Sequence, residues 1–150
     1  MVYLQENLDE SVVGQGVLPY PAGYFGFLKG GSKTGVKSLV ALAMRAVAQC
    51  PDAKIVLGGF SQGAQVLRKA VHRLPATVYH RILAIVSFSD SKEGRPFPEG
   101  LEERRVSFCA QGDWVCDRKY SLLSGAHKSL FYYDYLERTV EFIRERMRDV

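Results

Sequence analysis

A serine between closely spaced glycines is the feature of this sequence that most directly indicates chemistry. Residues 59–63 read Gly-Phe-Ser-Gln-Gly, a G-x-S-x-G pattern centred on Ser61. Small flanking residues permit the strained strand-to-helix turn that exposes a nucleophilic serine. At the start of the helix, the backbone N–H of Gln62 would point at the negative oxygen that develops on an attacked carbonyl. The pattern therefore favours acyl transfer, with a glycine-rich turn and an N-capping serine as the simpler alternative.

A nucleophilic serine needs a base, and the sequence offers three histidines. A serine hydroxyl is activated by a histidine that an acid orients. In folds whose nucleophile lies on a G-x-S-x-G turn, the chain order is serine, acid, histidine. His72 falls inside a predicted helix, and His80 precedes a strand and comes before the expected acid. His127 lies in a predicted loop before the last helix. We therefore predict that His127 is the general base.

Asp113 is the preferred candidate for the orienting acid. It directly follows a predicted strand and lies between Cys109 and Cys116, whose separation of seven residues can close a small ring. Such a ring would hold the carboxylate rigidly, as an orienting acid requires. Three other aspartates remain alternatives: Asp90, Asp117 and Asp134.

Helical and strand patterns alternate along the chain that must position these residues. Apolar residues at helical or strand spacing predict a helix at 33–50, a strand at 53–58, a helix at 62–74, strands at 82–88 and 105–109, and a helix from 132 to the end. Joined by right-handed crossovers, these elements form an α/β fold, a three-layer α/β/α sandwich with a small, mainly parallel sheet. A weaker pattern suggests a strand at 11–13, and residues 14–31 are expected to form an ordered loop.

The composition indicates one ordered domain spanning 1–150. The 150 residues include 47% hydrophobic residues, which is enough for one core and excludes intrinsic disorder. The net charge of +4 is spread over interleaved acidic and basic residues at the C-terminus, so nucleic-acid binding is not expected. No apolar run reaches the roughly 18 residues of a membrane span. We expect a monomer without a membrane span.

Three segments of the chain together resemble the cutinase family of serine esterases, which includes acetylxylan esterases. They are Cys-Pro-Asp-Ala at 50–53 leading to Gly-Gly-Phe-Ser-Gln-Gly-Ala at 58–64, Gly-Asp-Trp-Val-Cys at 112–116, and Gly-Ala-His at 125–127. The resemblance in order and spacing extends from about residue 12 to the C-terminus. It implies a cutinase-like α/β-hydrolase fold.

The resemblance also implies the roles of individual residues. Ser61 is similar to the family's nucleophile, Asp113 to its acid and His127 to its base, while Cys109 and Cys116 resemble its second disulfide. By the same resemblance the protein is a secreted enzyme with an exposed active site, although no export signal is readable at its N-terminus. Ester hydrolysis needs no organic cofactor, and no His, Cys or carboxylate spacing suggests a metal site.

The first residues depart from the family pattern. Cys50 matches a family cysteine whose partner usually lies on a first strand, followed by an Arg-Gly-Ser or Arg-Gly-Thr turn that completes the oxyanion hole. Residues 1–13 resemble neither feature. Losing one oxyanion donor costs about 100- to 1000-fold in turnover. The expectation is thus a family member without its first strand, and the alternative function is a catalytically weak or inactive cutinase-like protein.

Two apolar segments could form walls for the acyl chain of an ester. The candidate wall residues are Phe25, Phe27, Leu28, Leu122 and Leu123, and packing in the core is the alternative for each of them. Such walls suit a short- or medium-chain ester, including a cutin-type polyester, better than a charged metabolite. The sequence does not separate cutin from acetylated xylan or simple lipids.

Overall fold

A parallel sheet lies at the centre of the fold. The structure is a computed structural model, and it describes residues 6–8, 12–17, 20, 22–117, 127 and 129–149. Within these residues the sheet has three strands in the order β1-β2-β3: β1 (Ile55–Phe60), β2 (Ile82–Phe88) and β3 (Arg105–Phe108). Both strand pairs are parallel.

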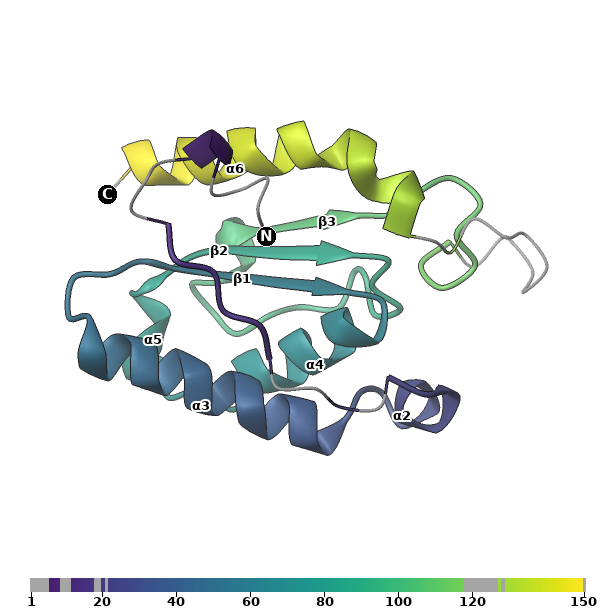
Figure 1. The fold of residues 1–150 in the computed structure, drawn as a ribbon, viewed down its shortest axis with the longest axis horizontal. Helices are drawn as coiled ribbons and strands as arrows, with labels where there is room; N and C mark the ends of the chain where they lie inside the picture. Colours follow the sequence, from purple (N-terminus) through teal and green to yellow (C-terminus); the bar gives the residue numbers. More distant parts are fainter. Residues whose placement is uncertain are drawn as a thin grey trace.

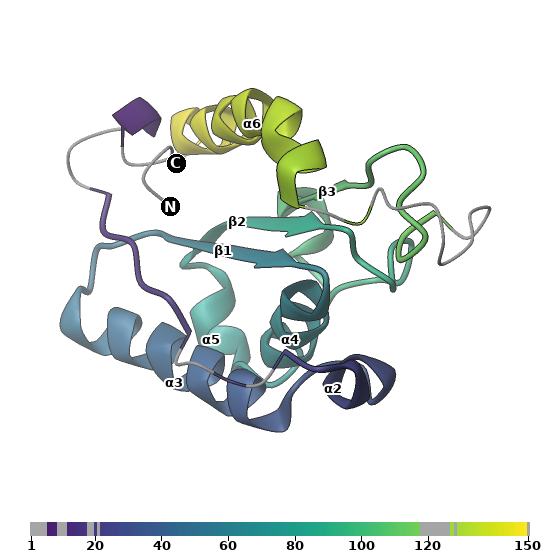
Figure 2. The same ribbon diagram turned by 45° about the vertical axis from the view of Figure 1, so that its right-hand side comes forward.

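Helices cover both faces of this sheet (Figure 1; Figure 2). One face is covered by α3, α4 and α5, and the other by α6. The predicted three-layer α/β/α arrangement is therefore confirmed. The helices are α2 (Tyr24–Leu28), α3 (Lys33–Gln49), α4 (Gln62–Val71), α5 (Ala76–Tyr79) and α6 (Leu136–Arg148), with 3-10 helices η1 (Glu102–Arg104) and η2 (Ser129–Tyr135). No described helix is both long and apolar enough to cross a bilayer.

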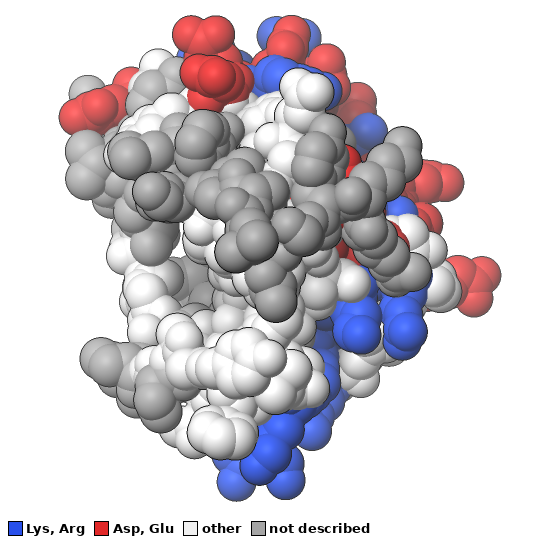
Figure 3. Space-filling model, turned by 90° about the vertical axis from the view of Figure 1, so that its right-hand side faces the viewer, with Lys and Arg blue, Asp and Glu red and all other residues white. Residues whose placement is uncertain are grey.

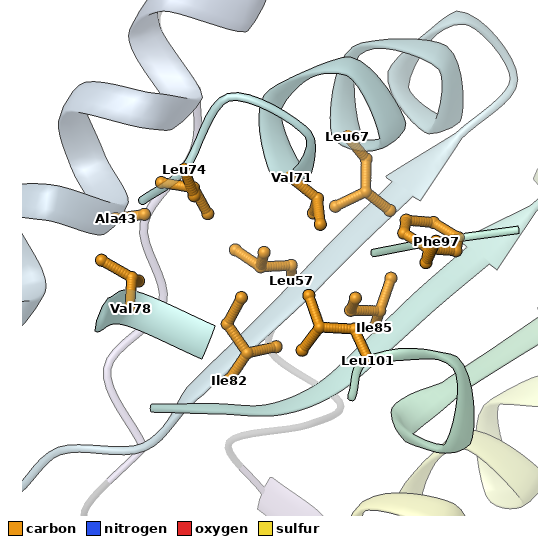
Figure 4. Close-up of a cluster of buried hydrophobic side chains, with 10 residues drawn as sticks. All are labelled: Ala43, Leu57, Leu67, Val71, Leu74, Val78, Ile82, Ile85, Phe97 and Leu101. Carbon is orange, nitrogen blue, oxygen red and sulfur yellow. The ribbon is translucent and has the colours of Figure 1, made fainter. Parts of the chain in front are cut away.

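Apolar clusters on both faces of the sheet hold the layers together. Leu67 of α4 packs with Ile82 and Ile85 of β2 on one face of the sheet, and all three are fully buried (Figure 4). On the other face, Ile143 of α6 packs against Leu83 and Ala84 of β2. A strand covered on both faces is apolar on both, which explains the apolar run at 82–86 in β2.

The strand ends lie in register at one edge of the sheet. Phe60, Phe88 and Phe108 are aligned across β1, β2 and β3. The next residues extend the ladder: Ser61 donates its N–H to the carbonyl of Phe88 at 2.9 Å, and Ser89 donates to that of Phe108 at 2.9 Å. This edge therefore presents the residues that follow each strand.

Several element boundaries differ from the sequence prediction. β1 begins at Ile55 and continues through Gly58 and Gly59 to Phe60, so the glycines belong to the strand instead of ending it. α4 ends at Val71, before the predicted limit, and the last helix is preceded by η2, which includes Tyr132. These are shifts at the ends of elements that otherwise lie where the sequence predicts them.

The segment before α3 differs more. Residues 14–31 were expected to form a loop, but they include the short helix α2. Val12 and Val13 do not belong to a strand, so the predicted strand at 11–13 is wrong for these two residues. Ser11 lies outside the described residues. α3 follows as predicted, with the Ser32 side chain capping it by accepting a 3.2 Å hydrogen bond from the Gly35 N–H.

Candidate active site

Ser61 lies on a sharp turn between β1 and α4. Its φ is +54° and its ψ −116°, a conformation that serine rarely adopts. Gly59 makes the turn possible, since a Cβ there would lie 2.6 Å from the Gly63 carbonyl oxygen and 2.8 Å from the Ala64 nitrogen. The close approach of strand and helix predicted from the glycine spacing is confirmed at Gly59, and it exposes the serine at the edge of the sheet.

Three side chains far apart in the sequence form one hydrogen-bonded line. Ser61 Oγ lies 2.8 Å from Nε2 of His127. On the other side of the ring, His127 Nδ1 lies 3.0 Å from Oδ1 and 3.1 Å from Oδ2 of Asp113. With the Nδ1 proton directed at the carboxylate, Nε2 is free to accept the serine proton. This geometry suits nucleophilic attack by the serine assisted by the imidazole.

The carboxylate of Asp113 is fully buried and receives hydrogen bonds from several directions. Tyr132 donates its hydroxyl to Oδ2 at 2.6 Å, and the backbone N–H of Val115 donates to Oδ1 at 2.9 Å. Burial by itself would raise the pKa of Asp113, but hydrogen bonds from Ser89, Tyr132, Val115 and His127 outweigh it and lower this pKa below its ordinary value. The acid is thus held in its charged form.

Aromatic rings fix the plane of the imidazole. Phe60 stacks on His127 with ring centroids 5.4 Å apart and an interplanar angle of 13°. Trp114 lies against the same ring at 5.6 Å in a tilted arrangement. Tyr132 packs edge-on against Phe60 at 5.4 Å. The imidazole is therefore oriented by packing as well as by hydrogen bonds.

The loop that carries Asp113 is closed by a disulfide. Cys109 and Cys116 are bonded, with their Cα atoms 5.8 Å apart, and Asp113 lies inside the ring that they close. Closing a ring of this size stabilises the folded chain by about 2 to 3 kcal/mol in the chain-entropy model. Cys50, by contrast, is free and exposed at the end of α3.

The alternative aspartates lie elsewhere. Asp90 is buried in an ion pair with Arg68, whose Nη2 lies 2.7 Å from Oδ2. Asp134 is exposed on η2. Asp117 follows the disulfide loop and donates its backbone N–H to the carbonyl of Asp113 at 2.8 Å. Among the candidate acids, Asp113 is the one whose carboxylate is within hydrogen-bond distance of His127 in the described part of the chain.

The other histidines lie away from this line. His72 follows α4, where it is exposed and stacks on Phe97 at 6.3 Å. His80 is exposed at the end of α5. Over the described residues, no group of three or more His, Cys, Asp or Glu is placed to hold a metal ion.

Gln62 connects the serine turn to α2. It is the first residue of α4, so its backbone N–H has no acceptor within the helix and is available to a ligand beside Ser61. Its buried side chain donates from Nε2 to the Gly23 carbonyl at 2.8 Å, at the N-terminal end of α2. Sequence reasoning assigned a function only to the backbone of Gln62 and missed this side-chain contact.

One aromatic residue of α2 contacts the rings of the site. Phe27 packs edge-on against Trp114 at 6.0 Å, and Trp114 in turn contacts His127. Phe25 and Leu28 are 77% and 61% exposed, so the alternative of core packing is wrong for both. Figure 3 shows this end of the molecule, where uncharged surface is bordered by Lys and Arg side chains. The predicted wall residues Leu122 and Leu123 lie outside the described residues.

Sequence reasoning missed two hydroxyl groups in the site. Tyr132 was predicted only as an apolar member of the last helix, yet its hydroxyl binds Asp113 and also accepts a 3.1 Å hydrogen bond from the Ala110 N–H. Ser89 Oγ lies 3.0 Å from His127 Nδ1. The position of Ser89 directly after a strand, like that of Ser61, was the available signal.

Replacing Tyr132 by phenylalanine is expected to destabilise the fold by about 1.5 to 3 kcal/mol at neutral pH, because a buried carboxylate loses a donor. The pKa of Asp113 is lowered in the folded state, so its contribution is present above its ordinary 3.8 and is lost as the pH falls. The pKa of Tyr132 is raised from its ordinary 10.0, mainly by burial and then by the bond to Asp113, so its contribution is lost as the pH rises above that value.

The stability difference between wild type and Tyr132→Phe should therefore be largest between these two values and smaller outside them. Urea unfolding followed at several pH values measures it. Tyr133→Phe is the matched control, because Tyr133 is adjacent and 62% exposed. Equal stability of the wild type and Tyr132→Phe at neutral pH would contradict the prediction.

The fold places this chain among the α/β hydrolases, in which the nucleophile lies on a strand-to-helix turn like that at Ser61. Comparison with known families agrees with this class. The chain belongs to the cutinase family, whose model, described as Cutinase, matches residues 2–147.

Known relatives support this membership. The chain is 36% identical over 115 residues to Cutinase CUT1 of Coprinopsis cinerea, covering 77% of this chain and 57% of that protein. It is 36% identical over 120 residues to a cutinase of Monilinia fructicola, covering 80% of this chain and 59% of that protein. The solved structure of Trichoderma reesei cutinase with a C11Y4 phosphonate inhibitor matches with a TM-score of 0.80 and 30% identity, over 97% of this chain and 64% of that chain. The chain thus spans less than two thirds of the length of each.

Proposed function

We propose that this protein is a serine esterase that hydrolyses carboxylic esters through an acyl-enzyme. The observation that carries the proposal is the line from Ser61 Oγ to His127 Nε2, at 2.8 Å, and from Nδ1 to Asp113, at 3.0 Å. In this proposal Ser61 is the nucleophile, His127 the general base and Asp113 the orienting acid.

In the first half-reaction, Ser61 Oγ attacks the ester carbonyl while His127 Nε2 takes the serine proton. The carbonyl oxygen becomes an oxyanion, and the Gln62 backbone N–H at the start of α4 stabilises it. His127 then gives the proton to the leaving alkoxide, which departs as the alcohol and leaves an acyl-Ser61 ester. Asp113 stabilises the imidazolium that forms between the two transfers.

In the second half-reaction, water replaces the alcohol. His127 Nε2 takes one proton from the water as its oxygen attacks the acyl-enzyme, again through an oxyanion. Collapse of this intermediate breaks the bond to Ser61 Oγ, which recovers its proton from His127. The carboxylic acid leaves, and the enzyme returns to its starting state.

The exposed aromatic surface beside the site supports a substrate with an apolar acyl part. Phe25 and Leu28 of α2 present apolar side chains to solvent. The side chain of Gln62, the residue after Ser61, binds the start of α2. We propose short- or medium-chain esters, including cutin-type polyesters, as substrates. The disulfide between Cys109 and Cys116 supports secretion, because such bonds persist in oxidising compartments.

Incubation with p-nitrophenyl butyrate and with a fluorophosphonate probe tests this proposal. The binding of a phosphonate inhibitor to the Trichoderma reesei relative supports the choice of probe. Turnover together with covalent labelling of Ser61 would support a competent esterase. Labelling with very slow turnover would favour the alternative function, a catalytically weak cutinase-like protein. Folded protein that neither labels nor turns over ester would contradict the proposal.

Phe25→Ser is expected to reduce hydrolysis of a solid polyester or a medium-chain ester several-fold, while p-nitrophenyl acetate hydrolysis stays near the wild-type rate. The reason is that Phe25 is 77% exposed and contributes little to the core, so the change removes apolar contact area and not stability. Initial rates on the three substrates measure the effect.

Met147→Ala is the matched control, because Met147 is also an exposed apolar residue, 44% exposed, at the far end of α6 (Figure 1). It should leave all three rates unchanged. A uniform change across the three substrates in Phe25→Ser would count against an acyl-chain wall at α2.

A further inference from the structure

Two serines occupy equivalent positions on neighbouring strands. Ser61 directly follows β1 and Ser89 directly follows β2, and each donates its N–H to the last residue of the next strand. Among the described residues other than glycine, those with positive φ are these two serines, each at +54°. The same positive φ thus occurs twice at one edge of the sheet.

The hydroxyls of these serines meet opposite sides of one imidazole. Ser61 Oγ lies 2.8 Å from Nε2 of His127, and Ser89 Oγ lies 3.0 Å from Nδ1. Ser89 is fully buried, and its hydroxyl is one of the groups that lower the pKa of Asp113. With the Nδ1 proton of His127 directed at the Asp113 carboxylate, the Ser89 oxygen faces the same N–H as a second acceptor.

Glycine would adopt this backbone conformation without strain, so a serine here is explained by its hydroxyl and not by the turn. Asp90, the residue after Ser89, is anchored firmly. Asp90 accepts a 2.8 Å hydrogen bond from the Lys92 N–H and forms the buried ion pair with Arg68, which also donates to the carbonyl of Arg95 at 2.8 Å. This anchoring holds Ser89 in the strained conformation that aims its hydroxyl at the site.

We propose that Ser89 is a positioning residue whose hydroxyl contacts the Nδ1 side of His127 beside the Asp113 carboxylate and holds the imidazole in the geometry needed for proton transfer at Ser61. This inference rests on the proposed esterase function. It assigns to the site a second serine, which neither attacks the ester nor receives its acyl group.

Ser89→Gly and Ser89→Ala test the proposal with p-nitrophenyl butyrate. Both remove the hydroxyl, but glycine also relieves the strained backbone. Both should lower kcat by about 10- to 100-fold, the effect of losing one hydrogen bond to a charged group, with KM little changed. Both variants lose the hydroxyl, but only alanine keeps the strained backbone, so Ser89→Gly should have a higher melting temperature than Ser89→Ala while the two lose a similar share of kcat. Ser91→Ala is the matched control. Ser91 lies in the same loop as Ser89, but its hydroxyl accepts a hydrogen bond from the Gln65 side chain instead of contacting His127.

A readout independent of turnover is the proton NMR signal of His127 Nδ1–H, which should shift in both variants and not in Ser91→Ala. Wild-type kcat in Ser89→Gly, or an unshifted Nδ1–H signal, would overturn the positioning role. A loss of activity that only parallels a loss of melting temperature would overturn it as well. If the wild-type protein shows neither turnover nor probe labelling, the proposed esterase function fails, whereas the NMR signal still decides whether Ser89 positions the ring.

Discussion

Ser61→Ala is expected to lower kcat for p-nitrophenyl butyrate by about 10⁴- to 10⁶-fold, because the covalent route disappears with the nucleophile. The residual rate would come from substrate binding and oxyanion stabilisation alone. The side chain of Ser61 has its hydrogen bond to His127 and does not cap α4, so the fold should be retained. Steady-state rates and fluorophosphonate labelling measure the effect.

Ser91→Ala serves as the control for the loss of a serine hydroxyl near the site, and it should keep both turnover and labelling. Circular dichroism verifies that both variants are folded. If Ser61→Ala still incorporated the probe, or hydrolysed the ester at a comparable rate, another nucleophile would be responsible and the role proposed for Ser61 would be wrong.

Asp113→Asn is expected to lower kcat by about 10⁴-fold, because an amide can donate to Nδ1 and so favours the wrong imidazole tautomer. His127 Nε2 would then carry the proton and could not accept one from Ser61. The substitution also places an amide group where Tyr132 and the Val115 N–H donate, so a loss of stability accompanies the loss of activity.

The pH dependence of the variant separates these two effects. In wild type the lowered pKa of Asp113 contributes stability above its ordinary 3.8, and this contribution is lost as the pH falls through the lower folded-state value. The asparagine side chain in Asp113→Asn does not titrate, so the free energy of unfolding of this variant should change less than that of wild type as the pH is lowered. Asp134→Asn, on the exposed surface of η2, is the control and should resemble wild type. Near-normal kcat in Asp113→Asn would assign the orienting role to another group.

The sequence was sufficient for features that depend on local pattern. The turn at Ser61 follows from glycine spacing within five residues, and the alternation of strands and helices follows from apolar periodicity. α2 was not predicted, because a five-residue helix is too short to show a helical period. The predicted strand at 53–58 ends before β1 does, because glycines are typical of the end of a strand and here lie within it.

Within the candidate site, local pattern could nominate residues but could not pair them. His127 and Asp113 were selected by chain order, and Asp90 remained possible until the structure showed its ion pair with Arg68. The contact between Ser89 and His127 joins residues 38 apart in the sequence, and that between Tyr132 and Asp113 joins residues 19 apart. Such contacts depend on how the strands and α6 pack, which no local period records.

The burial of Asp113 has a consequence for the energetics of proton transfer. Its negative charge is surrounded by hydroxyl and backbone dipoles that are already oriented before any substrate binds. In bulk water, the solvent would have to reorganise around a new imidazolium–carboxylate pair, and that reorganisation would add to the barrier. Here the dipoles do not need to turn during the reaction, so the folding of the chain has already met this part of the activation energy.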